Sequence, residues 1–511
     1  MDRLQNSNKR IAKNTLIVYI ELFTTIIINL VISRLVLQAL GASDFGLYNV
    51  VGGVIAMFTF ISNSMTTTTI RFLNFEMGKP VGDVCKIFNQ SNVLHISFAI
   101  IILFLLETIG SFYIINYLNV DPGKESDAMF VFQVSTVIAC VGVISVPYKS
   151  VFIAHEHFTA VAIIDVVSVL AKLLVVIMLL YYNGNVLRVY AFGMSLVTFF
   201  SIIIYYVLCK KNWPQIVRWK FVRNWRSYKE QLFYSNWNLL ATASMVGRNQ
   251  GSAIIINLFF GTIVNAAYAI SMQVFQQVNH FVGKFDAAVA PQITQNLGSG
   301  NFDRSTYLAS HTCRASILMM IVIFFPLYLE LDYILHLWLG DNIPEGTLLF
   351  CQYTLLIAIV SSTGGGLMQL INGVSKIKWF KIQSFCWNVL PLFIACYAFT
   401  LGSAPYIIVL LFVFADIFNR ATQLYLLHRL YSFDVKGFIK QAFMRPVLVF
   451  GIMIVYSWMY YKLTLDSHFY HILGIVITII IASALVFFGG LTVNERSKIA
   501  DIVVSRVKWL R

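Results

Sequence analysis

Long apolar blocks alternate with short polar segments along the whole chain. At about 1.5 Å of helix rise per residue, each block is long enough to cross the roughly 30 Å hydrocarbon core of a bilayer. A lone strand in lipid would leave its backbone groups unpaired, so we expect each block to be a helix. The pattern predicts an all-α integral membrane protein with about fourteen transmembrane helices, at residues 14–37, 45–64, 91–115, 128–146, 158–182, 189–209, 237–260, 265–289, 308–329, 347–371, 382–401, 404–426, 446–463 and 468–489.

Composition and charge support this fold class. Of the 511 residues, 58% are hydrophobic and 12% are charged, whereas a soluble domain carries roughly 25% charged residues. The net charge of +14 lies almost wholly in alternate connecting segments. The most basic of them joins the sixth and seventh blocks and contains Lys210, Lys211, Arg218, Lys220, Arg223, Arg226 and Lys229. This alternation follows the positive-inside rule, so we predict that both termini are cytoplasmic and that no nucleic acid is bound.

Motifs for catalysis and for metal or nucleotide binding are missing from the sequence. It contains no G-x-x-x-x-G-K-[ST], H-E-x-x-H or G-x-S-x-G, which excludes a P-loop ATPase and two common hydrolase types. The seven cysteines are scattered and show no C-x-x-C spacing, so neither a disulfide framework nor a zinc site is expected. We therefore predict a transporter rather than an enzyme, with no cofactor and no metal.

A weak internal repeat suggests how the helices are grouped. Gly41 and Tyr48 lead into the second block with the same separation as Gly261 and Tyr268, which lead into the eighth. Pairing blocks one to six with seven to twelve gives two pseudo-symmetric six-helix lobes, with a site between them. The predicted parts are an N-lobe at 1–211, a basic cytoplasmic linker at 212–234, a C-lobe at 235–430, and two further helices with a basic cytoplasmic tail at 431–511.

Ionisable residues inside the apolar blocks are costly in lipid, so each indicates a cavity or a pair. They include Glu21 and Arg34 in the first block, Asp165 and Lys172 in the fifth, Arg248 in the seventh, and Asp416 and Arg420 in the twelfth. Lys172 and Arg248 lie near the middle of their blocks, where a side chain cannot easily reach the interface. Arg34 lies near an end and could do so. Asp416 and Arg420 could pair within one helix and serve packing alone.

Two polar stretches interrupt the apolar pattern. The second block ends in a run of Ser, Asn and Thr residues followed by Arg71. In the eighth block, polar residues recur at steps of three and four, which places them on one helical face: Gln273, Gln276, Gln277, His280 and Lys284. Hydrogen bonds between packed helices could explain such a stripe, but its length and its amides favour a hydrated cavity.

Several short motifs, in order, resemble those of a known transporter family. They are Leu40-Gly41 through Tyr48, then Val146-Pro147-Tyr148, Pro291-Gln292-Ile293 and Leu337-Trp338-Leu339-Gly340. With fourteen helices, they are similar to the Wzx-type O-antigen and capsule repeat-unit flippases of the multidrug/oligosaccharidyl-lipid/polysaccharide superfamily. The resemblance implies a bacterial inner-membrane protein that moves an undecaprenyl-diphosphate-linked oligosaccharide to the periplasmic leaflet by alternating access. Other polysaccharide assembly proteins are then further expected partners, besides membrane lipids.

This resemblance gives the polar residues expected roles. A diphosphate in low dielectric needs cationic partners, for which Lys172, Arg248, Arg34 and Arg71 are the candidates. The amide stripe of Gln273, Gln276, Gln277 and His280 is expected to bind sugar hydroxyls. Glu21, Asp165 and Asp416 are candidates for coupling to a proton or sodium gradient.

Two alternatives remain. A cation-coupled multidrug exporter of the same superfamily would have about twelve helices and would use cavity carboxylates for cationic cargo. A membrane polysaccharide polymerase is less compatible, because the connecting segments predicted to lie outside the cell membrane are too short for its active site.

Overall fold

The computed structural model describes residues 2–56, 59–116, 123–340, 343–374, 376–461, 468–493 and 495–497. All regular secondary structure among these residues is helical, which confirms the predicted all-α class. They form two compact units. The N-unit comprises Met1–Thr242 and Thr294–Asn301, and the C-unit comprises Ala243–Ile293 and Phe302–Arg511. The boundary thus lies inside one long helix, and the predicted linker at 212–234 falls within the N-unit.

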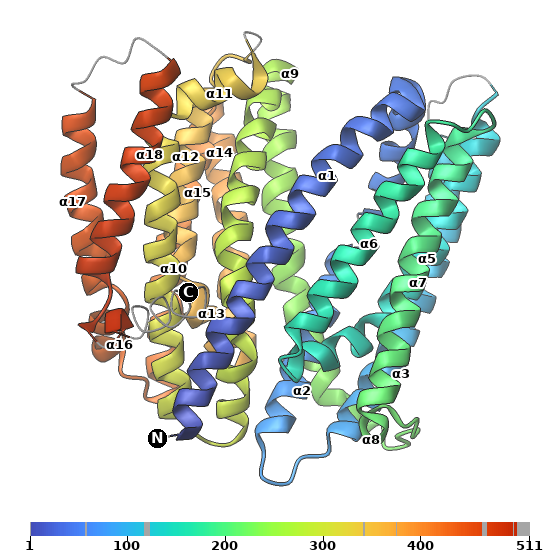
Figure 1. Ribbon diagram of the computed structural model, residues 1–511, viewed down its shortest axis with the longest axis horizontal. Helices are drawn as coiled ribbons and strands as arrows, with labels where there is room; N and C mark the ends of the chain where they lie inside the picture. Colours follow the sequence, from blue (N-terminus) through green and yellow to red (C-terminus); the bar gives the residue numbers. More distant parts are fainter. Residues whose placement is uncertain are drawn as a thin grey trace, which may run out of the picture. The chain divides into compact units, whose positions relative to one another are not determined.

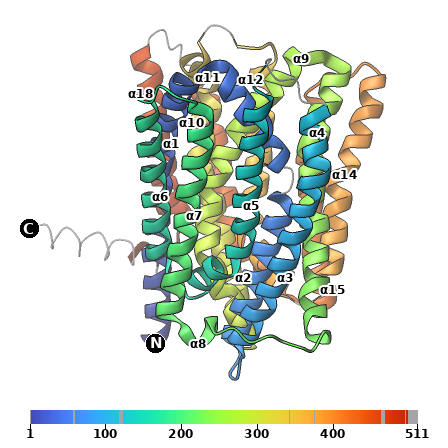
Figure 2. The same ribbon diagram turned by 90° about the vertical axis from the view of Figure 1, so that its right-hand side faces the viewer.

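The N-unit is a bundle of long helices (Figure 1). In chain order it contains α1 (Asp2–Ala56), α2 (Thr59–Gly78), α3 (Val84–Leu105) with a π-helical turn η1 (Leu106–Gly110) into α4 (Ser111–Asn116), α5 (Glu125–Ala154), α6 (Phe158–Leu179), α7 (Val186–Asn212) and α8 (Pro214–Val217). Helix α5 lies at its centre, against α2, α3 and α7, while α1 packs along α6 (Figure 2). Phe132, Val131 and Leu187 are fully buried in its core.

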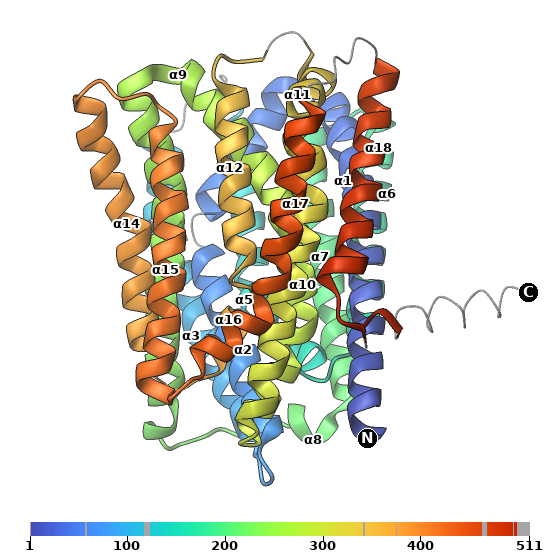
Figure 3. The ribbon, with the colours of Figure 1, turned by 90° about the vertical axis from the view of Figure 1, so that its left-hand side faces the viewer.

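The C-unit is built around α10. In chain order it contains α10 (Phe302–Leu329), α11 (Leu331–Leu339), α12 (Thr347–Ser362), α13 (Gly365–Gly373), α14 (Lys378–Thr400), α15 (Ile407–Tyr431), α16 (Val435–Ala442), α17 (Met444–Tyr460), α18 (His468–Leu485) and η2 (Val486–Gly490). Helix α10 contacts α12 and α13 on one side and α16, α17 and α18 on another (Figure 3). The last two predicted helices are therefore packed against the centre of this unit.

Helix α9 (Arg226–Gly298) contributes to both units. It is kinked at Gly261, whose φ of 80° and ψ of −172° are accessible to glycine and strained for other residues. This kink separates the predicted helices 237–260 and 265–289. The last turns of α9 belong to the N-unit, where they approach the end of α2. A Cβ on Gly298 would lie 2.0 Å from the Phe75 carbonyl oxygen, so glycine is needed for this contact.

The number of membrane spans depends on the criterion. Among the described residues, eight helices are long and apolar enough to cross a membrane, or ten if each of the bent pairs α12–α13 and α16–α17 forms one span. The predicted number of fourteen is not confirmed. The other predicted spans lie in α1, α2 and the two arms of α9. Of these, α2 and α9 carry many of the polar residues, which lower their hydropathy.

Candidate functional site

A charged cluster joins four helices inside the N-unit. The ammonium group of Lys149 on α5 lies 3.0 and 3.2 Å from the two carboxylate oxygens of Asp165 on α6. The Tyr205 hydroxyl on α7 donates to the same carboxylate at 3.0 Å. Lys172 lies close enough to Asp165 for an electrostatic interaction. The buried Glu21 of α1 likewise interacts electrostatically with the Tyr205 hydroxyl. We call Glu21, Lys149, Asp165, Lys172 and Tyr205 the N-cluster.

A second cluster joins three helices of the C-unit. The guanidinium of Arg248 on α9 forms a two-point ion pair with Asp416 on α15, at 2.9 and 3.2 Å. It also contacts Asn388 of α14 at 3.4 Å and lies over the Phe412 ring at 4.1 Å. Asn388 in turn donates to Ser244 at 3.0 Å. The side chains of Arg248 and Asp416 are only 13% and 11% exposed, so the ion pair is largely shielded from solvent. We call Ser244, Arg248, Asn388 and Asp416 the C-cluster.

The two clusters use corresponding helices of the proposed repeat. Glu21 lies on the first helix of its half, Asp165 on the fifth and Tyr205 on the sixth. Arg248, Asn388 and Asp416 lie on the first, fifth and sixth helices of the second half. Each unit thus carries charged or polar cluster residues on the first, fifth and sixth helices of its half.

A third charged region lies where a span of the C-unit is broken. Helices α12 and α13 meet at 50°, and the turn between them contains consecutive glycines. A Cβ on Gly365 would lie 2.4 Å from Asp286 Oδ1, and one on Gly364 would overlap the Arg420 guanidinium. Asp286 accepts a hydrogen bond from Ser316 at 2.6 Å, while Arg420 donates to Gln423 at 2.8 Å. The glycines therefore make room for two partly buried charged side chains at the break.

The predicted polar stripe is on the surface of the C-unit. Gln273, Gln276, Gln277 and His280 are all exposed, whereas Ser271, Val278 and Val282 on the opposite face of the same arm are buried. The stripe occupies the middle of this arm, which runs from the kink at Gly261 to Gly298. If this arm spans the membrane as predicted, four exposed polar side chains on one face would be costly in lipid, which favours a hydrated environment for them.

The remaining predicted cationic residues differ in position. Arg71 is 4% exposed and lies over the rings of Phe72, Phe75 and Tyr234, with 4.4, 4.9 and 5.0 Å to their centroids. It is thus enclosed by aromatic side chains. Arg34 lies on α1, but its side chain is outside the described part of the structure. Their predicted contacts with a cargo stay predictions.

One predicted pairing and one predicted position differ from the structure. Asp416 does not pair with Arg420 four residues away, because Arg248 reaches it from a neighbouring helix with better geometry. Lys149, predicted to lie in a connecting segment, is on α5, since this helix continues to Ala154 and carries Pro147 within it. Arg248 is already neutralised by a carboxylate, so a bound anion would have to compete with Asp416 for it.

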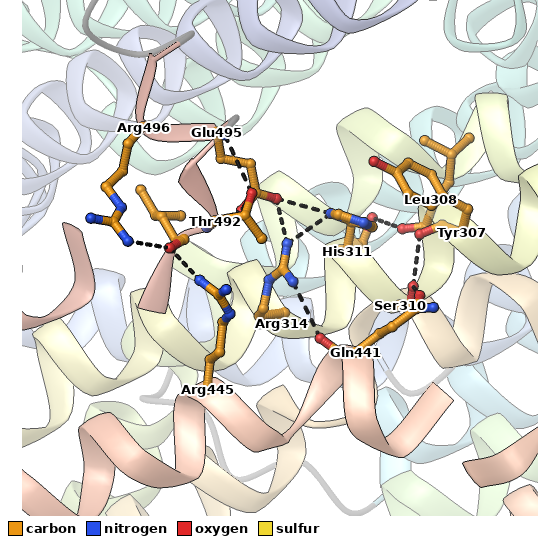
Figure 4. A network of polar contacts seen from close by, with 12 residues as sticks. Tyr307, Leu308, Ser310, His311, Arg314, Gln441, Arg445, Thr492, Glu495 and Arg496 are labelled. Carbon is orange, nitrogen blue, oxygen red and sulfur yellow. Dashed lines mark hydrogen bonds and ion pairs between the residues drawn. The ribbon is translucent and has the colours of Figure 1, made fainter. Parts of the chain in front are cut away.

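Polar contacts also fasten α17 and α18 to α10, at both ends. At one end, the buried carboxylate of Glu330 accepts a hydrogen bond from Tyr460 and lies 2.7 Å from His471 Nδ1. At the other, Glu495 pairs with Arg314 and lies 2.9 Å from His311 Nδ1 (Figure 4). Burial opposes ionisation of Glu495, but the hydrogen bonds from His311 and Thr492 and the charge of Arg314 lower the pKa of this carboxyl to about 2.

Sequence reasoning missed some of these residues. Asp286, Arg314 and Glu330 lie in or beside predicted helices, and their charge in an apolar context was the signal that could have found them. Tyr205 carries no such signal, because tyrosine is common in apolar blocks. Among the described residues, no group of His, Cys, Asp and Glu is arranged to hold a metal ion.

The fold is that of a multi-pass membrane protein in which two helical units are joined by α9. No known sequence family matches the chain, and no curated protein matches it in sequence. Solved structures do match in fold. They include a multidrug resistance MATE family transporter of the MOP superfamily in an outward-facing conformation, with a TM-score of 0.67 and 12% identity over 85% of this chain and 97% of that one. A MATE in complex with MaL6 gives a TM-score of 0.69 at the same identity and coverage.

A third match bears on the polarity of the site. A MOP superfamily transporter from Pyrococcus furiosus, described as having a binding pocket of reverse polarity that suggests a different function, gives a TM-score of 0.67 at 13% identity over 84% of this chain and 96% of that one. At such low identity these likenesses show the fold alone. The chain therefore has the fold of the MATE transporters.

Proposed function

We propose that this chain is a flippase that moves a lipid-linked oligosaccharide across the bacterial inner membrane by alternating access. The observation that carries the proposal is the exposed stripe of Gln273, Gln276, Gln277 and His280 in the predicted span 265–289. Amides and an imidazole offer donors and acceptors without net charge, which suits the many hydroxyls of a saccharide. A small apolar or cationic drug would leave most of these groups unsatisfied.

Two further features support this proposal. The chain continues beyond α15 with α16, α17 and α18, which pack on α10, whereas exporters of the superfamily are expected to have about twelve helices. Three carboxylates described above are engaged: Asp165 by Lys149 and Tyr205, Asp416 by Arg248, and Asp286 by Ser316. Lys172 has no hydrogen-bonded partner in the part of the chain that is described, and it is the best placed of the predicted cations to meet a diphosphate.

The second candidate is a cation-coupled multidrug exporter. It is favoured by the solved structures that share the fold, since one of them is described as a multidrug resistance MATE family transporter. It is also consistent with the pairing of Arg248 by Asp416, which removes one of the two central cations from the case for an anionic cargo. In this candidate the carboxylates of both clusters would exchange their present partners for a coupling cation.

An experiment in the source bacterium separates the two candidates. Cells depleted of the protein are expected to accumulate lipid-linked repeat units on the inner leaflet and to lose surface polysaccharide, with unchanged sensitivity to cationic drugs. Replacing Gln276 and Gln277 together by Ala should reproduce the defect, while Gln215→Ala, an exposed glutamine on the short helix α8, should not. Normal polysaccharide together with increased drug sensitivity would instead establish the exporter.

A further inference from the structure

A groove in the N-unit is charged at one end and apolar along its length. It has a volume of about 430 Å³ and lies between α2, α3 and the first turns of α9. This volume is within the roughly 300–1,000 Å³ of typical ligand sites. Trp225 and Lys229 line it at the beginning of α9, and Met65, Phe98, Phe233 and Leu239 line its length. Neither cluster described above contributes a residue to it.

The depth of the groove matches one leaflet of a bilayer. Lys229 lies in the first turn of α9, and Leu239 lies about 15 Å further along the helix at 1.5 Å per residue. This is half of the roughly 30 Å hydrocarbon core. The cation is therefore placed at headgroup level when the apolar residues lie at the level of the acyl chains.

Of the three uncharged polar side chains that line the groove, Ser64 and Ser235 are bonded within the protein, and Asn236 is exposed. Ser64 Oγ donates to the Ser235 carbonyl oxygen at 3.2 Å, and Ser235 Oγ donates to Thr68 Oγ1 at 3.2 Å. The wall facing the groove is thus left mainly to the aliphatic and aromatic side chains. Lys229, by contrast, forms no ion pair or hydrogen bond within the described part of the chain and is exposed.

The segment leading into the groove combines basic and aromatic residues. Arg218, Lys220, Arg223 and Arg226 are exposed and alternate with exposed aromatic residues, Trp219, Phe221 and Trp225. Such a combination is typical of protein surface at an anionic membrane interface. The segment is held in place on α3, because Asn89 donates to the Arg218 carbonyl oxygen and accepts from the Lys220 N–H, both at 3.0 Å.

We propose that this groove binds one anionic phospholipid, with its acyl chain against Phe98, Phe233 and Leu239 and its phosphate at Lys229. The basic segment supplies charge complementarity beyond the single lysine, since Glu230 is the one acidic residue between positions 213 and 239. A resident lipid at this place would tie α2 and α3 to the beginning of α9. This site is separate from the proposed transport function and does not depend on it.

Quenching of Trp225 by brominated lipid tests the proposal. The purified protein is placed in nanodiscs containing brominated phosphatidylglycerol or brominated phosphatidylcholine, and the signal of a Trp225→Phe variant is subtracted to isolate Trp225. We expect the anionic lipid to reach half-maximal quenching at about five-fold lower mole fraction, from the attraction typical of one interfacial cation. Lys229→Gln should abolish this preference, while Lys210→Gln, an exposed lysine outside the groove, should keep it.

Other outcomes would overturn the proposal. Equal quenching by the two lipids, or an unchanged preference in Lys229→Gln, would show that the groove does not select an anionic lipid. Relief of quenching by inorganic phosphate would indicate a site for a free anion, and quenching that depends on protein concentration alone would indicate a second copy of the chain. Retention of phosphatidylglycerol in native mass spectra, lost in Lys229→Gln, provides a second readout. Neither readout requires transport.

Discussion

Arg248 and Asp416 form a two-point ion pair between α9 and α15, with Nη1–Oδ1 and Nη2–Oδ2 distances of 2.9 and 3.2 Å. Both side chains are nearly buried. Removing one partner of such a pair leaves an uncompensated charge, at a cost of about 3–5 kcal/mol. We therefore expect Arg248→Ala and Asp416→Ala each to lower the free energy of unfolding in detergent by this amount.

The exchanged variant R248D/D416R is the control for this pair. It should recover part of the loss, because the charges remain matched. Lys79→Ala, which breaks an exposed pair with Glu76, should cost no more than about 1 kcal/mol. If the exchanged variant is as unstable as the single variants, the pair does not stabilise the fold through its charge.

The Tyr205 hydroxyl provides a second test, in the N-unit. It donates to Asp165 at 3.0 Å, and a hydrogen bond to a charged group contributes about 1.5–3 kcal/mol. Tyr205→Phe should therefore be less stable by about that amount in chemical unfolding. Tyr206→Phe is the matched control, since Tyr206 is exposed and its ring contact with Tyr148 is kept. Equal stability of the two variants would mean that the hydroxyl is not part of the N-cluster.

The glycines at the beginning of α13 should differ in their tolerance of alanine. A Cβ on Gly366 would lie 2.1 Å from the backbone oxygen of Ala309 on α10, which cannot move aside easily. A Cβ on Gly365 would meet only the end of the Asp286 side chain, and one on Gly142 would meet nothing within 4 Å. Overpacking costs about 1–3 kcal/mol, so the thermal stability of the variants should fall in the order Gly142→Ala, Gly365→Ala, Gly366→Ala. A Gly366→Ala protein as stable as Gly142→Ala would contradict the close approach of α13 to α10.

The helical fold could be predicted from the sequence because hydropathy and helix length are local properties. The break at Gly261 was visible as a gap between two apolar blocks. The number of spans was less predictable, because polar side chains lower the mean hydropathy of α2 and α9. The extent of α5 was also not visible, because Pro147 suggests an end where the helix continues to Ala154.

The pairing of the charged residues could not be predicted in the same way. Periodicity places Asp165 and Lys172 on one face, but it cannot show that Lys149 and Tyr205 reach Asp165 from two other helices. It likewise offered Arg420 as a partner for Asp416, whereas Arg248 is the partner found. Contacts between distant helices depend on packing, which the sequence of one chain does not reveal directly.

The ion pair between Glu495 and Arg314 predicts a pH dependence of stability. The pKa of Glu495 is lowered from 4.5 to about 2 in the folded state. Its contribution is therefore complete above pH 4.5 and is lost as the pH falls toward 2, because the unfolded state takes up the proton first. The melting temperature of wild type should fall over this range more steeply than that of Glu495→Gln, which cannot titrate there. Asp332→Asn, at an exposed aspartate on α11, should keep the wild-type slope. Equal slopes for wild type and Glu495→Gln would show that Glu495 does not fasten the end of α18 to α10 through its charge.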